Sequence, residues 1–228
     1  IELDVPALKI GSGECNNLPL IEYIAKKNKP LILSTGMNSI KSVNETTKIL
    51  EIYKSEYALL HCTNVYPTPP HLVRLDCLKI LREKYPNKVI GLSDHTITNY
   101  TSLGAIALGA SIIERHFTDS KVRIGPDIAC SMDPAELEEL IEGSKVLFEA
   151  RGDDKNPVEE ELNTLEFANA SVVAITNIEK NTLLSLDNIW IKRPGNGDFL
   201  AKDFKNLIGK RSKVKILSGD QIKKENLE

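Results

Sequence analysis

Short apolar runs alternate strictly with amphipathic segments along the first two thirds of the chain. Five runs have the length of a β-strand, at residues 7–10, 30–33, 57–61, 89–92 and 110–114. Segments of helical periodicity follow the first four, at residues 18–27, 39–53, 72–84 and 99–108. Continuous apolar strands joined by crossover helices are typical of a parallel sheet buried on both faces, so the sequence predicts an α/β fold.

The rest of the chain has a different pattern. An Asp-Pro-Ala-Glu sequence at residues 133–136 predicts the start of a helix that ends near Ala150. A hydrophilic linker is expected at 151–167, which separates a first domain at 1–150 from a second at 168–228. We expect the second domain to be small and mostly β, with strands at 171–175, 189–191 and 213–216 and one helix at 201–208.

Composition limits the partners of the protein. The chain has 29 Lys and Arg against 32 Asp and Glu, a formal net charge of -3, so no overall positive field attracts nucleic acid or an anionic membrane. We found no membrane span or secretory signal, and the four cysteines form no CxxC pair. We therefore expect a cytoplasmic protein with reduced thiols, without nucleic-acid or membrane partners, that binds any anion locally.

Polar residues follow each of the five predicted strands, at the sheet edge where ligands of parallel α/β folds bind. In chain order they include Lys9, Ser12, Glu14, Ser34, Asn64, Tyr66, Ser93, His95, Glu114 and His116. The Gly-Ser-Gly and Ser-Thr-Gly turns at 11–13 and 34–36 provide backbone N–H and hydroxyl donors for a phosphate, or are ordinary turns.

His95 and His116 occupy equivalent positions after successive strands, 21 residues apart. If both point to the same side, two imidazoles on neighbouring strands can share a divalent metal with open coordination positions. The alternative is two hydrogen-bonded structural histidines. Glu14 and Glu114 are candidates for proton transfer, or for an ion pair at the rim.

Five further residues have a structural interpretation or two open ones. His61 and His71 are expected to be structural, and Trp190 and Phe204 are expected in the core of the second domain. Arg193, in a Pro-Gly-Asn-Gly turn, is either solvated or contacts a carboxylate, sugar or phosphate.

Seven motifs in this order resemble the sialic acid synthase family. They are KIGSGECNN (9–17), LSTGM (33–37), LHCTNVYP (60–67), GLSDHT (91–96), ERHFT (114–118), GPD (125–127) and KRPGNGD (192–198). The resemblance implies a TIM barrel followed by an antifreeze-like (SAF) domain, and a domain-swapped homodimer. It implies condensation of phosphoenolpyruvate with N-acetylmannosamine to N-acetylneuraminate and phosphate, with C–O cleavage.

The resemblance also implies roles for individual residues. His95 and His116 correspond to ligands of a catalytic divalent metal, most often Mn²⁺, with Mg²⁺ or Co²⁺ as alternatives. The phosphoenolpyruvate positions correspond to Lys9, Ser12, Ser34, Asn64 and Ser93. The positions around the acceptor sugar correspond to Glu14, Tyr66, Asp127 and, from the swapped domain, Arg193.

The family barrel has eight strands, whereas only five precede the linker in this chain, and residue 1 is Ile. We therefore expect a partial barrel that lacks the first three strand–helix units, and a longer native product. Two alternatives stay open: a sister synthase for legionaminic or pseudaminic acid, which uses a diacetamido hexose, and a catalytically incomplete piece that acts only as a binding module.

Overall fold

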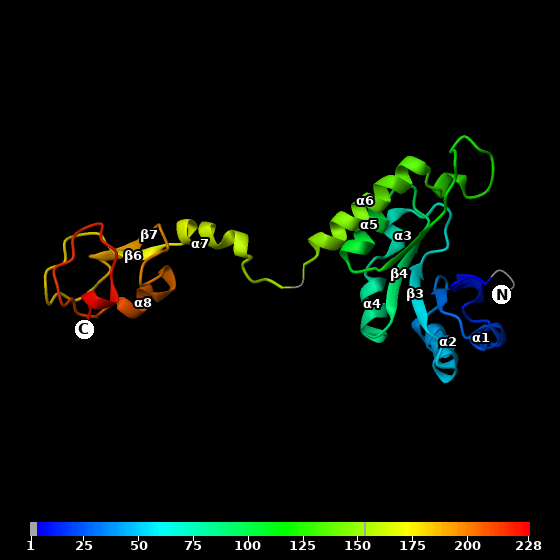
Figure 1. Cartoon of the computed structure of the whole chain (residues 1–228), viewed down its shortest axis with the longest axis horizontal. Coiled ribbons are helices and arrows are strands. Elements are labelled where there is room, and N and C mark those ends of the chain that lie inside the picture. Colours follow the sequence, from blue (N-terminus) through cyan, green and yellow to red (C-terminus); the bar gives the residue numbers. More distant parts are fainter. Residues whose placement is uncertain (1–3, 153) are drawn as a thin grey trace. The chain divides into compact units, whose positions relative to one another are not determined.

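The computed structural model describes residues 4–152 and 154–228. The chain forms two compact units that divide after Gly152 (Figure 1).

A parallel five-stranded sheet forms the first unit. Its strands are β1 (Leu8–Ile10), β2 (Leu31–Ser34), β3 (Tyr57–Cys62), β4 (Val89–Asp94) and β5 (Ile112–Arg115), and they pair in sequence order. This is the strand order of five consecutive units of a TIM barrel, so the expected partial barrel is confirmed. Each predicted strand matches an observed strand to within two residues at either end.

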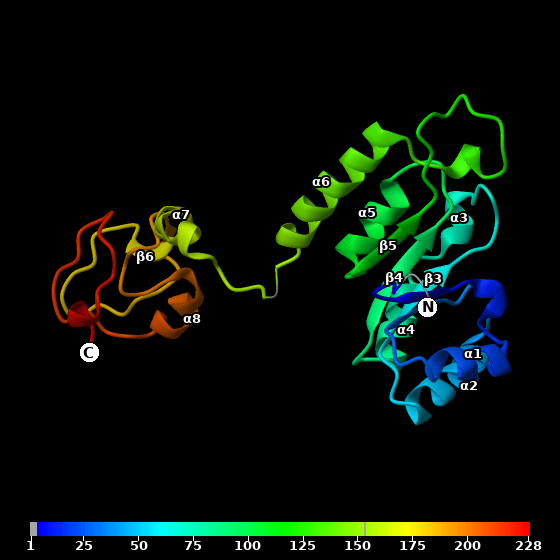
Figure 2. The ribbon, with the colours of Figure 1, turned by 45° about the vertical axis from the view of Figure 1, so that its right-hand side comes forward.

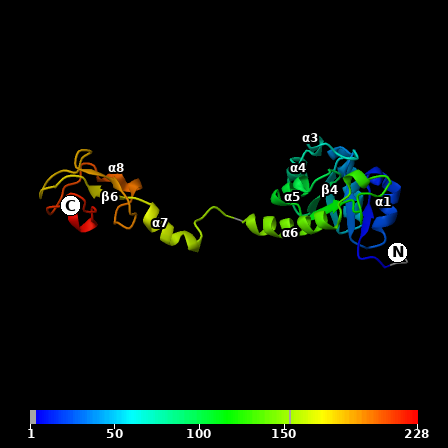
Figure 3. The same cartoon turned by 90° about the horizontal axis from the view of Figure 1, so that it is seen from above.

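The helices of the first unit follow the strands in alternation. They are α1 (Leu18–Ala25), α2 (Ile40–Ile52), α3 (Pro70–Val73), α4 (Cys77–Lys84), α5 (Tyr100–Ala107) and α6 (Pro134–Ala150), with short 3-10 turns at η1 (Ser12–Glu14) and η2 (Ile128–Cys130). Figure 2 and Figure 3 show α5 and α6 side by side. The predicted start of α6 is confirmed, because Asp133 and Glu136 form a reciprocal capping box.

One predicted helix is divided. Residues 72–84 form α3 and α4 rather than one helix, because Arg74 adopts a left-handed conformation with φ 54° and ends α3.

Helices pack on one face of the sheet. The buried cluster there joins Leu33, Leu59 and Leu92 of the strands to Ile21 and Leu50 of the helices. The alternation of strands and helices predicted helices on both faces of the sheet, and this prediction is wrong. The strands are consecutive units of a barrel, in which helices cover only the outer face. Successive side chains of a strand point to opposite faces, so Lys9, Ser34, Ser93 and Glu114 belong to the other, inner face.

The second unit is small and has little regular structure. It contains η3 (Glu159–Glu161), α7 (Leu162–Ala168), β6 (Ser171–Ala174), β7 (Ile189–Lys192), η4 (Ala201–Asp203), α8 (Phe204–Leu207) and η5 (Lys224–Asn226). Strands β6 and β7 are antiparallel. Their core includes Val172, Ile178, Leu184, Ile189 and Ile222.

Two expectations for this unit need correction. The strand at 213–216 does not form, because the bonds there are single bridges such as Ile178 to Ile216. Trp190 is 51% exposed rather than in the core, since it points to the outer face of β7, where its ring packs edge-on against the partly buried Phe204.

Candidate active site

A polar chain crosses the inner face of the sheet at its carboxyl edge. The Lys9 ammonium donates to Ser34 Oγ at 2.8 Å and lies 3.2 Å from a Glu114 carboxylate oxygen. Ser93 Oγ donates to the other oxygen of Glu114 at 2.9 Å, and these two residues are paired across β4 and β5. The structure thus brings four of the predicted site residues together, and it pairs Glu114 with a cation.

His95 and His116 lie side by side just beyond β4 and β5. Their ring centroids are 5.3 Å apart, and His95 is buried. Nδ1 of His95 is 3.0 Å from the Thr63 carbonyl oxygen, which can only accept, so Nδ1 carries the proton and Nε2 keeps a free lone pair. Burial lowers the pKa of His95 and favours the neutral imidazole that binds metals.

Tyr66 and Asp127 flank the two histidines. The Tyr66 ring centroid is 4.1 Å from that of His95 and 5.8 Å from that of His116. An Asp127 carboxylate oxygen is 3.9 Å from His116 Nδ1. A cavity of about 110 Å³ is lined by Ser93, His95, Glu114, Arg115 and His116.

The donor set fits a divalent cation with open positions. In the described part of the chain, no group of three or more His, Cys, Asp or Glu side chains is arranged to hold a metal ion. Two adjacent imidazoles, one with its second nitrogen fixed by a carbonyl, are ligands suited to a divalent transition-metal ion. Such a site leaves positions free for substrate oxygens and water.

The loops after β1 and β2 form a tight turn around Gly36. The Gly36 N–H donates to Ser12 Oγ at 3.0 Å, and the Asn38 amide donates to the Ser12 carbonyl at 3.0 Å. A Cβ atom on Gly36 would lie 1.8 Å from Asn64 Oδ1 and 2.8 Å from Ser12 Oγ. Gly36 therefore permits the close approach of Ser12 and Asn64, two predicted phosphoenolpyruvate ligands.

The side-chain contact of Glu14 lies outside this group. Glu14 is exposed at the end of η1, where its carboxylate accepts from Asn17 Nδ2 at 2.6 Å. Arg193 belongs to the second unit and is exposed in the turn after β7. Hydrogen bonds from Ser171 Oγ to the Pro194 carbonyl at 2.8 Å and from Gly197 N to Ser171 Oγ at 2.9 Å anchor that turn.

His61 has the structural role that the sequence predicted. It lies on the helix side of β3, is buried, and its Nε2 is 2.6 Å from the Val73 carbonyl. The sequence analysis missed Asp94 and Arg115, which precede the two site histidines. The strand alternation that placed Ser93 and Glu114 inside also places these two on the opposite face, and this was the available signal.

Comparison with known proteins decides the family. Residues 1–156 match the model of the NeuB family, and residues 169–228 match the model of the SAF domain. The chain belongs to the NeuB family. As a NeuB-family chain with a C-terminal SAF domain, it carries the two modules that the sequence motifs predicted.

Similar proteins in the family have different names. The chain is 34% identical to human N-acetylneuraminate-9-phosphate synthase, over 98% of this chain and 63% of that protein. It is 38% identical to N,N'-diacetyllegionaminic acid synthase of Campylobacter jejuni, over 92% and 63%. A structure from Chromobacterium violaceum, of a putative spore coat polysaccharide biosynthesis protein E, aligns with 98% of this chain and 68% of that chain at a TM-score of 0.78 and 23% identity, which supports the fold.

The chain spans about three fifths of the length of the curated relatives it matches. None of the helices in residues 4–152 and 154–228 has the length and apolar character to cross a membrane.

Proposed function

We propose that this chain carries the metal-binding and phosphoenolpyruvate-binding part of a nonulosonic acid synthase. The reaction condenses phosphoenolpyruvate with N-acetylmannosamine and water to give N-acetylneuraminate and phosphate. The single observation that supports it best is the position of the Lys9 ammonium group, which shares the inner sheet edge with the paired imidazoles of His95 and His116.

Phosphoenolpyruvate is a trianion that needs several donors. Lys9 supplies a positive charge, and hydroxyl groups come from Ser12 after β1, Ser34 of β2 and Ser93 of β4. The Asn64 side chain adds an amide beside Gly36. A bound phosphate competes with Glu114 for the ammonium group, since both are anions within its reach.

His95 and His116 would hold a divalent cation, for which we propose Mn²⁺, with Mg²⁺ or Co²⁺ as alternatives. The ion supplies a Lewis acid for the carbonyl oxygen of the acceptor. Tyr66 and Asp127 lie next to the histidines, and in this proposal they position the open-chain sugar there.

The bond changes follow from the two substrates. C3 of phosphoenolpyruvate bonds to the aldehyde carbon of the acceptor, and the aldehyde oxygen takes a proton. Water then adds to C2, and the bond from C2 to the phosphate oxygen breaks, which releases phosphate. Proton transfer is proposed for Glu14, which lies exposed in η1 shortly after β1, the strand that carries Lys9, and whose carboxylate accepts from Asn17 Nδ2.

Arg193 completes the site in a domain-swapped homodimer. In this proposal the SAF domain of one subunit covers the barrel of the other, so that Arg193 of the partner subunit contacts the acceptor. The anchored turn after β7 suits that role, because it presents the guanidinium from a fixed backbone.

A diacetamido hexose is the second candidate acceptor, because the chain is 38% identical to the Campylobacter legionaminic acid synthase. The barrel residues named above bind phosphoenolpyruvate and the cation, which both reactions share. A catalytically incomplete binding module is the third candidate, because the chain spans only about three fifths of its relatives.

Phosphate release tests these candidates. The purified protein is incubated with Mn²⁺, phosphoenolpyruvate labelled with ¹⁸O in the bridging position, and either N-acetylmannosamine or a 2,4-diacetamido hexose. We expect acceptor-dependent release of phosphate that retains the ¹⁸O, with N-acetylmannosamine as the faster acceptor. A faster reaction with the diacetamido sugar identifies a sister synthase, and no release with either contradicts synthase activity of this chain.

A further inference from the structure

A buried polar network lies directly behind the two histidines, on the helix side of the sheet. Asp94 and Arg115 pair across β4 and β5, and each immediately precedes one histidine. The pair Ser93 and Glu114 occupies the adjacent register position on the inner face. At the ends of β4 and β5, Ser93 and Glu114 therefore face the site, while Asp94 and Arg115 face the helices.

Asp94 holds the residue that follows His95. Its buried carboxylate accepts from the Thr96 backbone N–H at 3.0 Å and from Ser102 Oγ at 2.7 Å. The Thr96 and Thr101 hydroxyls also donate to it. The carboxylate therefore ties the segment after β4 to the first turns of α5.

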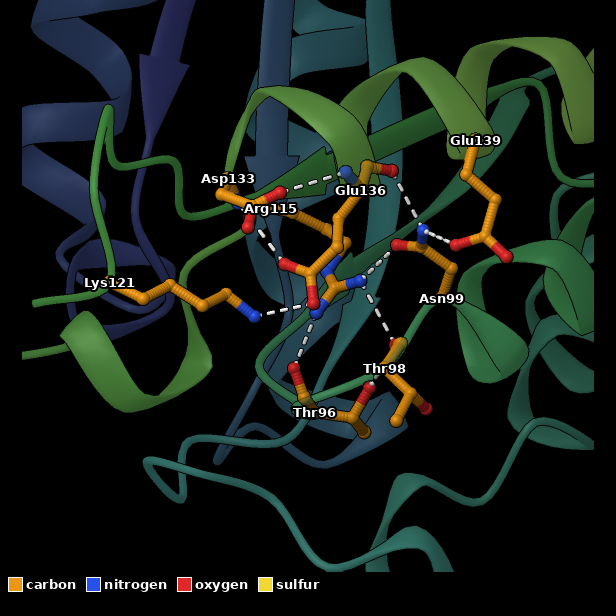
Figure 4. A network of polar contacts seen from close by, with 8 residues as sticks. All are labelled: Thr96, Thr98, Asn99, Arg115, Lys121, Asp133, Glu136 and Glu139. Carbon is orange, nitrogen blue, oxygen red and sulfur yellow. Dashed lines mark hydrogen bonds and ion pairs between the residues drawn. The ribbon is translucent and has the colours of Figure 1, made fainter.

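Arg115 holds the same segment from the other side. Its guanidinium donates to the carbonyl oxygens of Thr96 and Thr98, the latter at 2.9 Å, and to Asn99 Oδ1 at 2.6 Å (Figure 4). These three acceptors lie in one loop, residues 96–99, which we call the β4–α5 loop. A planar guanidinium can donate to three separate acceptors from one fixed position, which a lysine ammonium on a flexible stem does less well.

The network extends to α6. Asn99 Nδ2 donates to the Glu136 carbonyl and to Glu139 Oε2, both at 2.7 Å. Glu136 closes the capping box with Asp133 and pairs with Lys121, as Figure 4 shows. The β4–α5 loop is therefore fixed between β5 and a 17-residue helix.

His95 depends on this anchorage. Its Nδ1 donates to the Thr63 carbonyl at 3.0 Å and lies 4.0 Å from Cys62 Sγ, and its backbone carbonyl accepts from Thr68 N at 2.9 Å. The residues on both sides of it, Asp94 and Thr96, both belong to the network. Loss of the Arg115 donors leaves the Thr96 and Thr98 carbonyls without these partners and releases the backbone that carries the imidazole.

We propose that Arg115 is a positioning residue, which holds the β4–α5 loop and thereby sets His95 against His116. The part of this inference that concerns Mn²⁺ affinity rests on the proposed function. The part that concerns the order of the β4–α5 loop rests on the hydrogen-bond network alone.

The test compares Arg115→Lys with Lys121→Met. Lys keeps the charge but not the planar fork, and Lys121 pairs with Glu136 without contacting the loop. We expect Arg115→Lys to raise amide hydrogen exchange across residues 95–99 at least tenfold, with exchange in β2 and β3 unchanged. We expect its dissociation constant for Mn²⁺ to rise about 10–100-fold, as for other partners of metal ligands. Lys121→Met is expected to change both quantities less than twofold.

Unchanged loop exchange in Arg115→Lys overturns the proposal, and so does a loosened loop with unchanged Mn²⁺ affinity. If the unsubstituted protein binds no Mn²⁺, the metal assignment fails, and the position of His95 is followed by the NMR resonances of its imidazole instead. A change of these resonances in Arg115→Lys but not in Lys121→Met supports the positioning role, and no change in Arg115→Lys overturns it. If Arg115→Lys does not fold, Asn99→Ala, which removes one of the three acceptors, is judged by the same two readouts.

Discussion

At the scale of single residues, the Lys9 ammonium supplies a positive charge among the proposed phosphoenolpyruvate ligands, 2.8 Å from Ser34 Oγ. We expect Lys9→Met to weaken phosphoenolpyruvate binding about 10–100-fold, since a hydrogen bond to a charged group contributes about 1.5–3 kcal/mol. The substitution also removes the cation that pairs with Glu114, and the unpaired carboxylate then repels the anionic ligand. Isothermal titration with phosphoenolpyruvate in the presence of Mn²⁺ measures the effect.

Lys29→Met is the matched control, because Lys29 pairs with Asp4 at the opposite, amino-terminal edge of the sheet. It is expected to bind phosphoenolpyruvate like the unsubstituted protein. Equal affinity in Lys9→Met and Lys29→Met would remove Lys9 from the site.

His61 gives the protein a pH-dependent stability. Burial lowers its pKa in the folded state, so the unfolded chain binds the proton more readily, and stability falls as the pH drops below the unfolded pKa of about 6.5. His61→Gln keeps a donor for the Val73 carbonyl but cannot titrate. Between pH 7.5 and 5.5 the unfolding free energy should fall more for the unsubstituted protein than for His61→Gln in urea titrations, and parallel losses would contradict this role.

At the scale of elements, the sequence pattern predicted helices and strands correctly where buried residues recur with a regular period. The five strands and the capping box of α6 were predictable, because apolar runs and the Asp133–Glu136 spacing are local signals. The break between α3 and α4 at Arg74 could not be predicted, because a left-handed residue other than glycine does not change the spacing of the apolar residues. The strand expected at 213–216 fails because single bridges to distant residues, rather than a ladder, satisfy that segment.

The candidate site was likewise predictable only where it depends on local sequence pattern. Alternation along β4 and β5 was enough to place Ser93, Glu114 and the two histidines together. The separation of Glu14 from this group, and the network behind it, depend on side-chain contacts between distant segments. Asn99 and Glu139, for example, are 40 positions apart in the chain.

The turn between β2 and α2 makes a sharp prediction. Gly36→Ala places a methyl group on Asn64 Oδ1 and Ser12 Oγ, and overpacking of this kind costs about 1–3 kcal/mol. We expect a lower unfolding free energy and at least tenfold weaker phosphoenolpyruvate binding, because Asn64 has to move. Gly13→Ala is the control, since no atom lies within 4 Å of its added Cβ, and it should behave like the unsubstituted protein in both measurements. Normal ligand affinity in Gly36→Ala would show that the turn does not shape the site.

At the scale of the whole molecule, the proposed domain swap predicts complementation between two inactive variants. In a mixed dimer of His116→Ala and Arg193→Ala, one site combines an intact barrel with an intact SAF domain, and the other site carries both defects. Random pairing of equal amounts restores about a quarter of the unsubstituted activity in a swapped dimer. The assay is phosphate release after joint refolding, with each variant alone as the baseline. Mixtures no more active than the sum of the two variants would rule out an Arg193 contribution across subunits.

The central claim is that His95 and His116 hold the cation of a synthase. It is tested most directly by Mn²⁺ binding and Mn²⁺-dependent phosphate release in His116→Ala, beside His71→Ala, an exposed histidine of α3. We predict that His116→Ala keeps its circular dichroism spectrum but loses both Mn²⁺ binding and condensation, whereas His71→Ala keeps both. Unchanged Mn²⁺ affinity and turnover in His116→Ala would contradict the account.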